Sequence, residues 1–236
     1  MGNSKPCYAP LAGEISAGVS AIAPAAIAAI PIGLLFGAVA GAKGLSGLEV
    51  TLMSALVFAG GSQFAAIETW SHPPPIAALA FATFLINARH LLMGASLAPK
   101  LRARGWRRWF AVFLMTDETW ALAERRALSQ PVTLAYWLAM GSCLYVVWVL
   151  STVAGAAVGS FLGEPDRIGA DFVFTALFIG LIAGFGRSRT TMAAVVGSAA
   201  GAALTHHIFG PPWHVAAGAL SGIAAAFLAA GQGARQ

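Results

Sequence analysis

Long apolar segments constrain the fold of this chain most. They cover residues 17 to 42, 48 to 70, 74 to 98, 109 to 123, 132 to 161, 168 to 186, 190 to 208 and 212 to 230. A helix needs about 20 apolar residues to cross a hydrocarbon core of about 30 Å. Because backbone polar groups in that core must bond within the protein, only helices or closed barrels can cross it.

A helical membrane bundle is the fold class that follows. The segments lack the period-two alternation of a membrane barrel. Composition agrees, since 58% of the residues are hydrophobic, 10% are charged and the mean hydropathy is +0.75. We predict an all-α, polytopic transmembrane helical bundle with seven or eight membrane segments, some broken or re-entrant. One transmembrane domain is expected over 17–230, between tails at 1–16 and 231–236, in the inner membrane of the cell.

The positive charge of the chain is concentrated between the apolar segments. The pI is near 9.8, and nine of the 14 Lys and Arg residues lie at Lys100 to Arg108, at Arg125 with Arg126, and at Arg187 with Arg189. Short basic loops of this kind face the cytoplasm and its anionic lipids. The charge therefore predicts orientation in a lipid bilayer, and no nucleic acid partner.

The segment at 109 to 123 is expected to enter the membrane and return. Only "WFAVFLM" is continuously apolar before Thr116, Asp117, Glu118 and Thr119 interrupt it. A re-entrant segment would keep all three basic loops on one side, whereas a full span would separate them. This interpretation leaves seven full spans, with the C-terminus inside and the N-terminus outside.

Three polar residues interrupt the third apolar segment. Asn87 is central in 76–98, and Thr83, Asn87, His90 and Gly94 would form one stripe of an unbroken helix. Arg89 falls off that stripe, so either it faces another wall or the helix unwinds locally near Asn87. A guanidinium at this depth needs a partner, and Asp117, Glu118 or a substrate carboxylate could provide one. The alternative is a buried network that only fixes helix packing.

The second segment contains "FAGGSQFAA", with Gly60, Gly61, Ser62 and Gln63 just past its centre. Paired glycines weaken a helix, and a broken helix exposes backbone N–H groups that can hold a carboxylate. Simple close packing at the glycine pair is the alternative.

The adjacent carboxylates of "LMTDETW" are expected to have different partners. Adjacent helical residues point about 100° apart, so at most one of Asp117 and Glu118 faces a given cavity. The other is expected to reach Arg125, Arg126 or water.

Glycines at a spacing of four indicate close helix packing, mainly within the chain: Gly33, Gly37 and Gly41; Gly155, Gly159 and Gly163; Gly180 and Gly184; Gly197 and Gly201; Gly218 and Gly222.

The first half of the chain resembles the AzlC family, the large subunits of two-component branched-chain amino acid exporters. The motifs are "PIGLLFGAVAGAKGLSGLEVTLMSALVFAGGSQFAA", then "NARHLLMGASLAPKLR" and "FLMTDETWAL". The family's Gly-x-Ser-Gln-Phe motif falls on Gly60, Ser62, Gln63 and Phe64, and its Asn-x-Arg-His motif on Asn87, Arg89 and His90. Gly61 stands where alanine is expected.

The resemblance implies export of valine, leucine, isoleucine and sometimes methionine, with a small AzlD-like membrane subunit and no cofactor. The broken second helix or Arg89 would hold the substrate carboxylate. Asp117, or backbone carbonyls that have lost their helical hydrogen bond, would hold the ammonium group. Phe58, Phe64 or Met93 would contact the aliphatic side chain. His90, Asp117 and Glu118 could couple transport to protons.

Two rival functions differ in class. An intramembrane serine hydrolase would use Ser62 with a later histidine, although Gln63 stands where that Gly-x-Ser arrangement expects glycine. A scaffold without transport fits the glycine faces but gives Asn87 and Arg89 no function.

Overall fold

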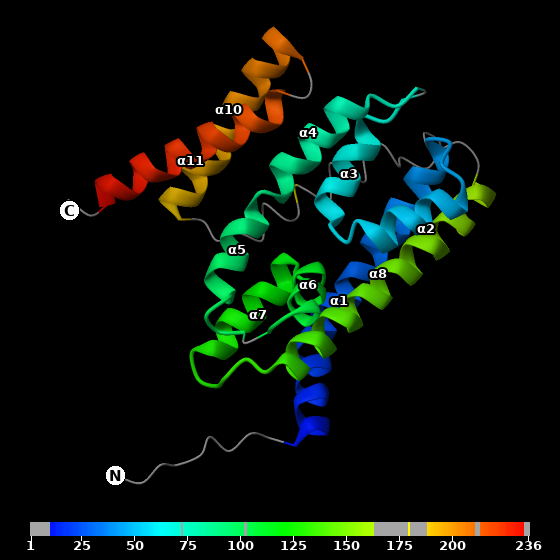
Figure 1. Cartoon of the computed structure of the whole chain (residues 1–236). Coiled ribbons are helices and arrows are strands. Elements are labelled where there is room, and N and C mark those ends of the chain that lie inside the picture. Colours follow the sequence, from blue (N-terminus) through cyan, green and yellow to red (C-terminus); the bar gives the residue numbers. More distant parts are fainter. Residues whose placement is uncertain are drawn as a thin grey trace. The chain divides into compact units, whose positions relative to one another are not determined.

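The computed structural model describes residues 10–71, 73–101, 103–162, 179, 188–210 and 213–233. Within these residues the chain forms helices and no strand, which confirms the predicted all-α class (Figure 1). The predicted segment at 168 to 186 lies outside them, apart from position 179. The helices are α1 (Leu11–Ala42), α2 (Gly47–Leu56), α3 (Gly60–Glu68), α4 (Ile76–Asn87), α5 (Arg89–Leu97), α6 (Trp106–Phe113), α7 (Asp117–Ala127), α8 (Leu134–Leu162), α10 (Arg189–Phe209) and α11 (Trp213–Gly233).

Among the described residues, four helical stretches are long and apolar enough to cross a membrane. They are Leu11–Ala42, Ile76–Leu97, Leu134–Gly159 and Arg189–Phe209. The second of them comprises α4 and α5 together. The two apolar segments predicted at 48 to 70 and 109 to 123 are instead divided into short helices.

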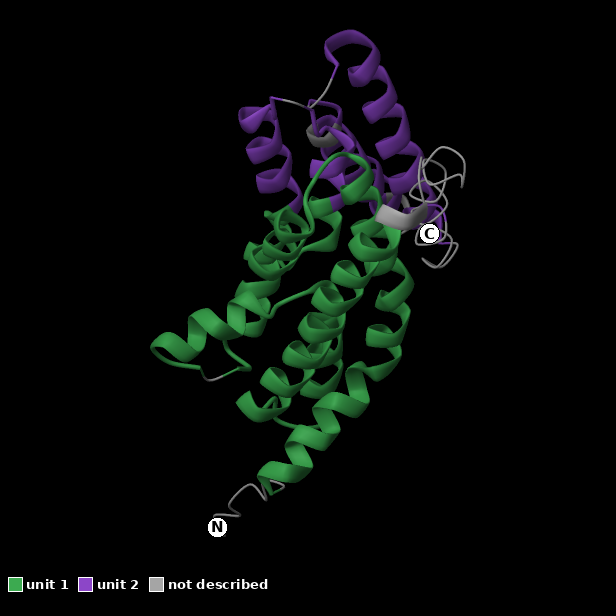
Figure 2. Ribbon diagram, turned by 90° about the vertical axis from the view of Figure 1, so that its right-hand side faces the viewer, with its two compact units in different colours: residues 1–63, 87–162 green, residues 64–86, 163–236 purple. Residues whose placement is uncertain are grey.

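The chain forms two compact units, coloured separately in Figure 2. The first comprises Met1–Gln63 and Asn87–Leu162, and the second comprises Phe64–Ile86 and Gly163–Gln236. The chain passes between them twice before the final part of the second unit. The expectation of one transmembrane domain over 17–230 stays a prediction.

The first unit is built on α1 and α8, which lie side by side (Figure 1). Successive glycines of α1 meet successive residues of α8: Gly18 meets Tyr136 and Met140, Gly33 meets Ser151, and Gly37 meets Thr152 and Ala156. The residue numbers rise together along both helices, so the two helices run parallel. A Cβ atom on Gly37 would lie 2.0 Å from the carbonyl oxygen of Thr152, so the backbones touch only because glycine is present.

Most of the predicted glycine faces pack within the chain, as expected. Gly155 and Gly159 lie against Leu34 and Ala38 of α1. In the second unit, α10 and α11 pack through Gly197 and Gly201 against Ser221, and through Gly218 and Gly222 against Ser198. Gly163, Gly180 and Gly184 lie outside the described residues.

A buried ion pair fixes the beginning of α1. Nη2 of Arg126 lies 2.8 Å from both carboxylate oxygens of Glu14, and the Thr133 hydroxyl also donates to that carboxylate. The guanidinium lies 4.0 Å above the ring of Tyr136. Arg126 therefore pairs with Glu14 rather than with Asp117 or Glu118. A charge pair this buried depends on all its hydrogen bonds being satisfied, and here two side chains donate three hydrogen bonds to one carboxylate.

This contact corrects the predicted orientation of the N-terminal end. That end was expected outside, opposite the basic residues that follow 125. The parallel packing and the Glu14–Arg126 pair put both at the same end of α8. The prediction was wrong because it treated 48 to 70 as one straight crossing.

Helices α6 and α7 form a hairpin. Its two arms both lead back to the same end of α8, the end at which α8 begins. The indole N–H of Trp137 donates to the carbonyl of Ala111 over 3.0 Å, and Leu114 lies against Gly141, farther along α8. The chain then comes back, because Arg126 lies beside Thr133 and Glu14. The fold-back predicted for 109 to 123 is thus present, with its tip at Leu114 to Thr116.

Helix α2 and the beginning of α3 form a second reversal. A capping box of Ser46 and Glu49 begins α2, which ends at Leu56. Residues 57 to 59 are not helical, and α3 begins at Gly60. The side chain of Gln63 reaches back to Ser54 over 3.2 Å. Nine residues of straight helix would separate these two positions by about 13 Å, so the chain must turn back here.

The tips of the two hairpins meet beside the middle of α8. Phe58, in the break between α2 and α3, lies 6.4 Å from the ring of Phe113, the last residue of α6. Both rings contact Tyr145 of α8, at 5.2 and 5.6 Å between ring centroids. These three residues form the aromatic contact.

We predict that Gly37→Ala destabilises the first unit, because its Cβ atom has no room against α8. Overpacking of this kind costs about 1 to 3 kcal/mol, or a fall in Tm of about 2 to 12 °C for a chain of this size. Gly41→Ala is the matched control, since its Cβ atom would meet nothing closer than the Ala156 oxygen at 3.9 Å. Thermal unfolding in detergent measures both, and equal Tm values would contradict the glycine contact.

Candidate functional site

The start of α3 brings Gly60, Gly61 and Ser62 to the helix break. Gly60 lies on the ring of Trp148, where a Cβ atom would approach to 3.1 Å. The backbone N–H groups of Ser62 and Gln63 both donate to the carbonyl of Ala59, over 3.1 and 3.0 Å. The backbone N–H groups of Gly60 and Gly61 are the first two of α3, and they have no intrahelical acceptor.

Gln63 joins the start of α3 to α2 and to α8. Its side chain is fully buried, and its Oε1 atom accepts from the indole N–H of Trp148 over 3.0 Å. Its Nε2 atom donates to the Ser54 hydroxyl over 3.2 Å. Because an indole N–H can only donate, this pair of contacts also fixes the orientation of the amide. Both ends of the predicted substrate-binding amide are therefore occupied by the protein.

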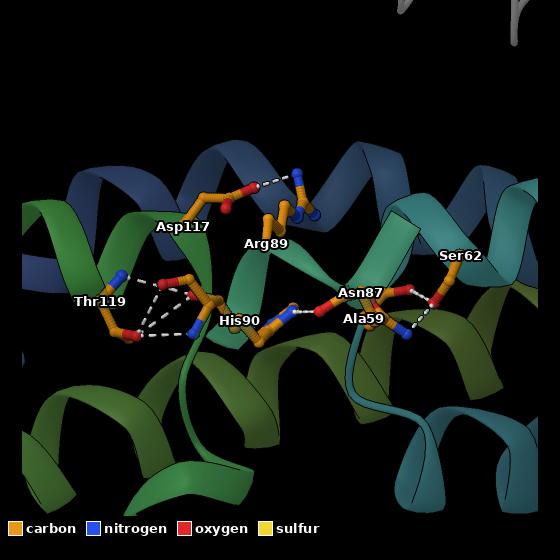
Figure 3. Close-up of polar contacts among 8 residues, drawn as sticks. Ala59, Ser62, Asn87, Arg89, His90, Asp117 and Thr119 are labelled. Carbon is orange, nitrogen blue, oxygen red and sulfur yellow. Dashed lines mark hydrogen bonds and ion pairs between the residues drawn. The ribbon is translucent and has the colours of Figure 1, made fainter. Parts of the chain in front are cut away.

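Asn87 joins the end of α4 to the start of α3 (Figure 3). Its Nδ2 atom donates to the Ser62 hydroxyl over 3.2 Å, and that hydroxyl donates to Ala59 over 2.9 Å. Its Oδ1 atom is buried and has no hydrogen-bond partner among the described residues. A buried acceptor without a donor costs about 1 to 3 kcal/mol. This atom is therefore the place in the network where a ligand N–H would be most favourable.

His90 is the second residue of α5 and lies next to this network. Its Nδ1 atom lies 3.1 Å from the backbone carbonyl of Asn87, which can only accept (Figure 3). Nδ1 therefore carries the hydrogen, and Nε2 is the basic nitrogen of the neutral ring. The helices α4 and α5 are separated only at Ala88, whose φ and ψ of −56° and −27° are helical, so the alternative of an unwound segment near Asn87 is not what the structure shows.

Arg89 and Asp117 form the ion pair that the sequence predicted. Nη1 of Arg89 lies 2.7 Å from Oδ2 of Asp117, with 45% and 47% of the two side chains exposed (Figure 3). Asp117 is the first residue of α7, where the helix dipole favours a negative charge. Thr116 and Thr119 cap that helix and hold its first turn in place. Glu118 is exposed and takes no part in this ion pair, as expected for adjacent carboxylates.

A second polar contact joins α5 to α7, and the sequence analysis missed it. The indole N–H of Trp120 donates to the Ser96 hydroxyl over 2.8 Å, and Ser96 donates to Glu124 over 3.0 Å. Lys100 also pairs with Glu124. The spacing of four between Ser96 and Lys100, and between Trp120 and Glu124, was the signal available. Together with Arg89–Asp117, these contacts join the two helices at two points.

The predicted site residues are therefore partly assembled. Ser62 and Asn87 are in contact, Gly60 and Gln63 share the ring of Trp148, and Arg89 meets Asp117. Phe64 is buried, and it is the first residue of the second unit. Trp148 was not predicted, although an indole in the middle of an apolar helix needs a hydrogen-bond acceptor and so signals one nearby.

Comparison with known proteins identifies several similar membrane proteins. The chain is 34% identical to an uncharacterized membrane protein of Archaeoglobus fulgidus, over 78% of this chain and 81% of that protein. It is 30% identical to the inner membrane protein YgaZ of Escherichia coli, over 98% of this chain and 96% of the relative. It is 32% identical to the branched-chain amino acid transport protein AzlC of Bacillus subtilis, over 63% of this chain and 58% of that protein. No solved structure matches.

The names of these relatives and the long apolar helices place the chain in the cell membrane, where it crosses several times. The family described as AzlC protein matches residues 24–162, which contain both hairpins, Asn87 and the Arg89–Asp117 pair. The chain belongs to the AzlC family.

Proposed function

We propose that this chain is the large subunit of an exporter for branched-chain or similar apolar amino acids. Valine, leucine and isoleucine are the expected substrates, with methionine as a further one, and export is driven by protons. A membrane transport role is supported by the family and by the name of the Bacillus relative. The observation that carries the proposal is the helix break whose neighbour, Asn87, has a buried oxygen without a donor.

The site offers a holder for each charge of a zwitterion. In the proposed complex, the substrate ammonium group donates to Oδ1 of Asn87 and is attracted by the negative charge of Asp117. The carboxylate is held by Arg89 or by the N–H groups of Gly60 and Gly61, which begin α3. Such groups bind a charged substrate inside a membrane only if they are fixed beforehand, and Gln63 with Trp148 fixes the break.

The Arg89–Asp117 pair supports a mode of binding in which the substrate carboxylate competes with Asp117 for Arg89. In the described residues Arg89 has one contact, from Nη1 to Oδ2, so most of its guanidinium donors are left for a second carboxylate. A substrate that binds there shares Arg89 with Asp117 and brings its own positive charge to Asp117. Charge stays balanced, so the substrate does not leave an isolated charge in the membrane.

Proton coupling is proposed to involve His90 and Asp117. A proton on Nε2 of His90 would add a positive charge near the substrate carboxylate, and a proton on Asp117 would release Arg89 to the substrate. Glu118, the third predicted coupling residue, is exposed and could exchange protons with water. Its role stays a prediction.

The small AzlD-like subunit is proposed from the family resemblance alone. The glycine faces give no support for a second chain, because those described pack α1 against α8 and α10 against α11. A scaffold without transport is less favoured, since it gives the buried Asn87 oxygen no function.

Efflux of labelled leucine from vesicles tests the proposed function. We expect export when this chain is reconstituted with its small subunit and little export by either chain alone. Imposing a proton gradient should change the rate of the pair. Export by this chain alone at the rate of the pair would refute the need for a partner. Absence of efflux for every apolar amino acid by the folded pair would refute the function.

Ser62→Ala separates transport from hydrolysis. The variant loses the hydroxyl between Asn87 and Ala59, so we expect leucine efflux to fall by about ten-fold, as for the loss of one to two hydrogen bonds. A serine-directed covalent probe should not label the wild type. Ser71→Ala, an exposed serine, is the matched control. Stoichiometric labelling that disappears in Ser62→Ala would establish the hydrolase instead.

Removing Arg89 and Asp117 together tests the ion pair. We expect Arg89→Ala and Arg89→Lys to lose most transport, since lysine keeps the charge but loses the planar fork that grips a carboxylate. Arg89→Ala with Asp117→Ala should fold better than Arg89→Ala alone while still failing to export. A half-exposed pair implies a coupling free energy of about 1 kcal/mol.

Glu118→Ala is the control for the thermal-stability part of that cycle, because it removes a neighbouring carboxylate outside the pair. Strict additivity of the Arg89 and Asp117 changes in thermal stability would contradict the pair. Normal efflux by Arg89→Ala would exclude Arg89 from the mechanism.

A further inference from the structure

An apolar groove of about 620 Å³ lies between α5 and α6 in the first unit. Its walls are made of aliphatic and small side chains, with one histidine and two arginines: His90, Leu91, Gly94, Leu97, Ala98, Leu101, Ala103, Arg104, Arg108, Ala111, Val112 and Met115. None of these residues is needed to hold α5 to α7 by a polar contact. The groove is therefore separate from the contacts of Ser96, Lys100 and Glu124.

The groove has a deep end and an open end. His90 and Met115 form the deep end, since His90 adjoins the Asn87 network and Met115 is in the tip of the α6–α7 hairpin. Leu101, Arg104 and Arg108 form the other end. The part of this wall that α5 forms, from His90 to Leu97, rises by about 10 Å, and the wall continues through Ala98 to Leu101. The groove is thus long enough to follow much of one leaflet, which is half of a hydrocarbon core of about 30 Å.

The two arginines at the open end have no carboxylate partner among the described residues. The ion pairs found there involve Arg89, Lys100 and Arg126. Gly105, with φ of 58°, makes the turn between Arg104 and Arg108, which both line the groove and are both exposed. Two guanidinium groups that line one groove without a carboxylate partner favour an anion there, and phosphate is an anion that the planar guanidinium fork binds well.

The outer side of α6 has the composition of a helix at the membrane surface. Trp106 and Trp109 are 72% and 78% exposed, and Phe110 is 43% exposed on the same short helix. Exposed tryptophan beside arginine is typical of the level of the lipid headgroups. This places Arg104 and Arg108 at the depth of phosphate groups and the apolar walls at the depth of acyl chains.

We propose that the groove binds an anionic phospholipid of the cytoplasmic leaflet, with its phosphate at Arg104 and Arg108 and one acyl chain along α5. The cytoplasmic side follows from the basic loop at 100 to 108. The competing occupant, an amino acid on its way to the central site, is disfavoured because the walls between His90 and the arginines offer nothing to an ammonium group. An acyl chain fits such walls and fills the length.

Native mass spectrometry of the purified chain, released from detergent in the presence of phosphatidylglycerol or phosphatidylcholine, tests this proposal. We expect retention of one phosphatidylglycerol in preference to phosphatidylcholine. Arg104→Ala with Arg108→Ala should weaken that retention by about ten-fold or more, as two arginine–phosphate contacts near a membrane imply. Lys43→Ala with Arg107→Ala is the matched control, because it removes the same charge outside the groove and should retain the lipid.

A second variant tests the acyl chain without changing charge. Ala98 is exposed and lines the groove, so Ala98→Phe should fill it and lower the retention of phosphatidylglycerol in a protein that still folds. Equal losses in the charge variant and its control, or no effect of Ala98→Phe, would overturn the proposal. Displacement of the lipid by excess leucine would also overturn it and identify the groove as a path for substrate.

Discussion

Backbone contact between α1 and α8 is the interaction on which the first unit depends. Where Gly37 meets the Thr152 carbonyl and Gly155 meets the Leu34 carbonyl, no side chain separates the helices. Helices in a bilayer gain little from hydrophobic burial against each other, so close van der Waals contact has to provide the attraction. The parallel pair then serves as a rigid wall. The α6–α7 hairpin is attached to this pair by the indole N–H of Trp137, which donates to the Ala111 carbonyl. The α2–α3 hairpin is attached by the Tyr145 hydroxyl, which donates to the Ala55 carbonyl.

The two hairpins place irregular backbone beside the middle of α8, and in a membrane such backbone is tolerated only if protein groups satisfy it. The Ala55 carbonyl, freed at the end of α2, accepts from the Tyr145 hydroxyl over 3.1 Å. Ser54 and Trp148 take both ends of Gln63. In that well-satisfied surrounding the Asn87 oxygen stands out as the unsatisfied acceptor. A network that is otherwise complete gives a ligand one defined place to bind, which favours selectivity over general polarity.

The sequence predicted much of this because membrane helices obey few rules. Apolar length located α1 and α8, the glycine pair located the break before Gly60, and the cost of a buried guanidinium led from Arg89 to Asp117. Hydropathy could not reveal that α2 and α3 reverse, because Ser62 and Gln63 are the only polar residues of "LVFAGGSQFAA" and would mark a broken crossing just as well as a turn. The N-terminal end was misplaced for that reason. The Glu14–Arg126 pair joins residues far apart in the sequence, and spacing alone could not connect them.

The aromatic contact of Phe58, Phe113 and Tyr145 has a mechanical consequence. Tyr145 belongs to α8, and its hydroxyl donates to the Ala55 carbonyl of α2, whereas Phe58 lies in the break between α2 and α3 and Phe113 ends α6. Phe58 and Phe113 therefore pack against the same side chain of α8. A change that displaces Tyr145 would loosen the tips of both hairpins at once, so this one residue couples the position of the break between α2 and α3 to that of the α6–α7 turn.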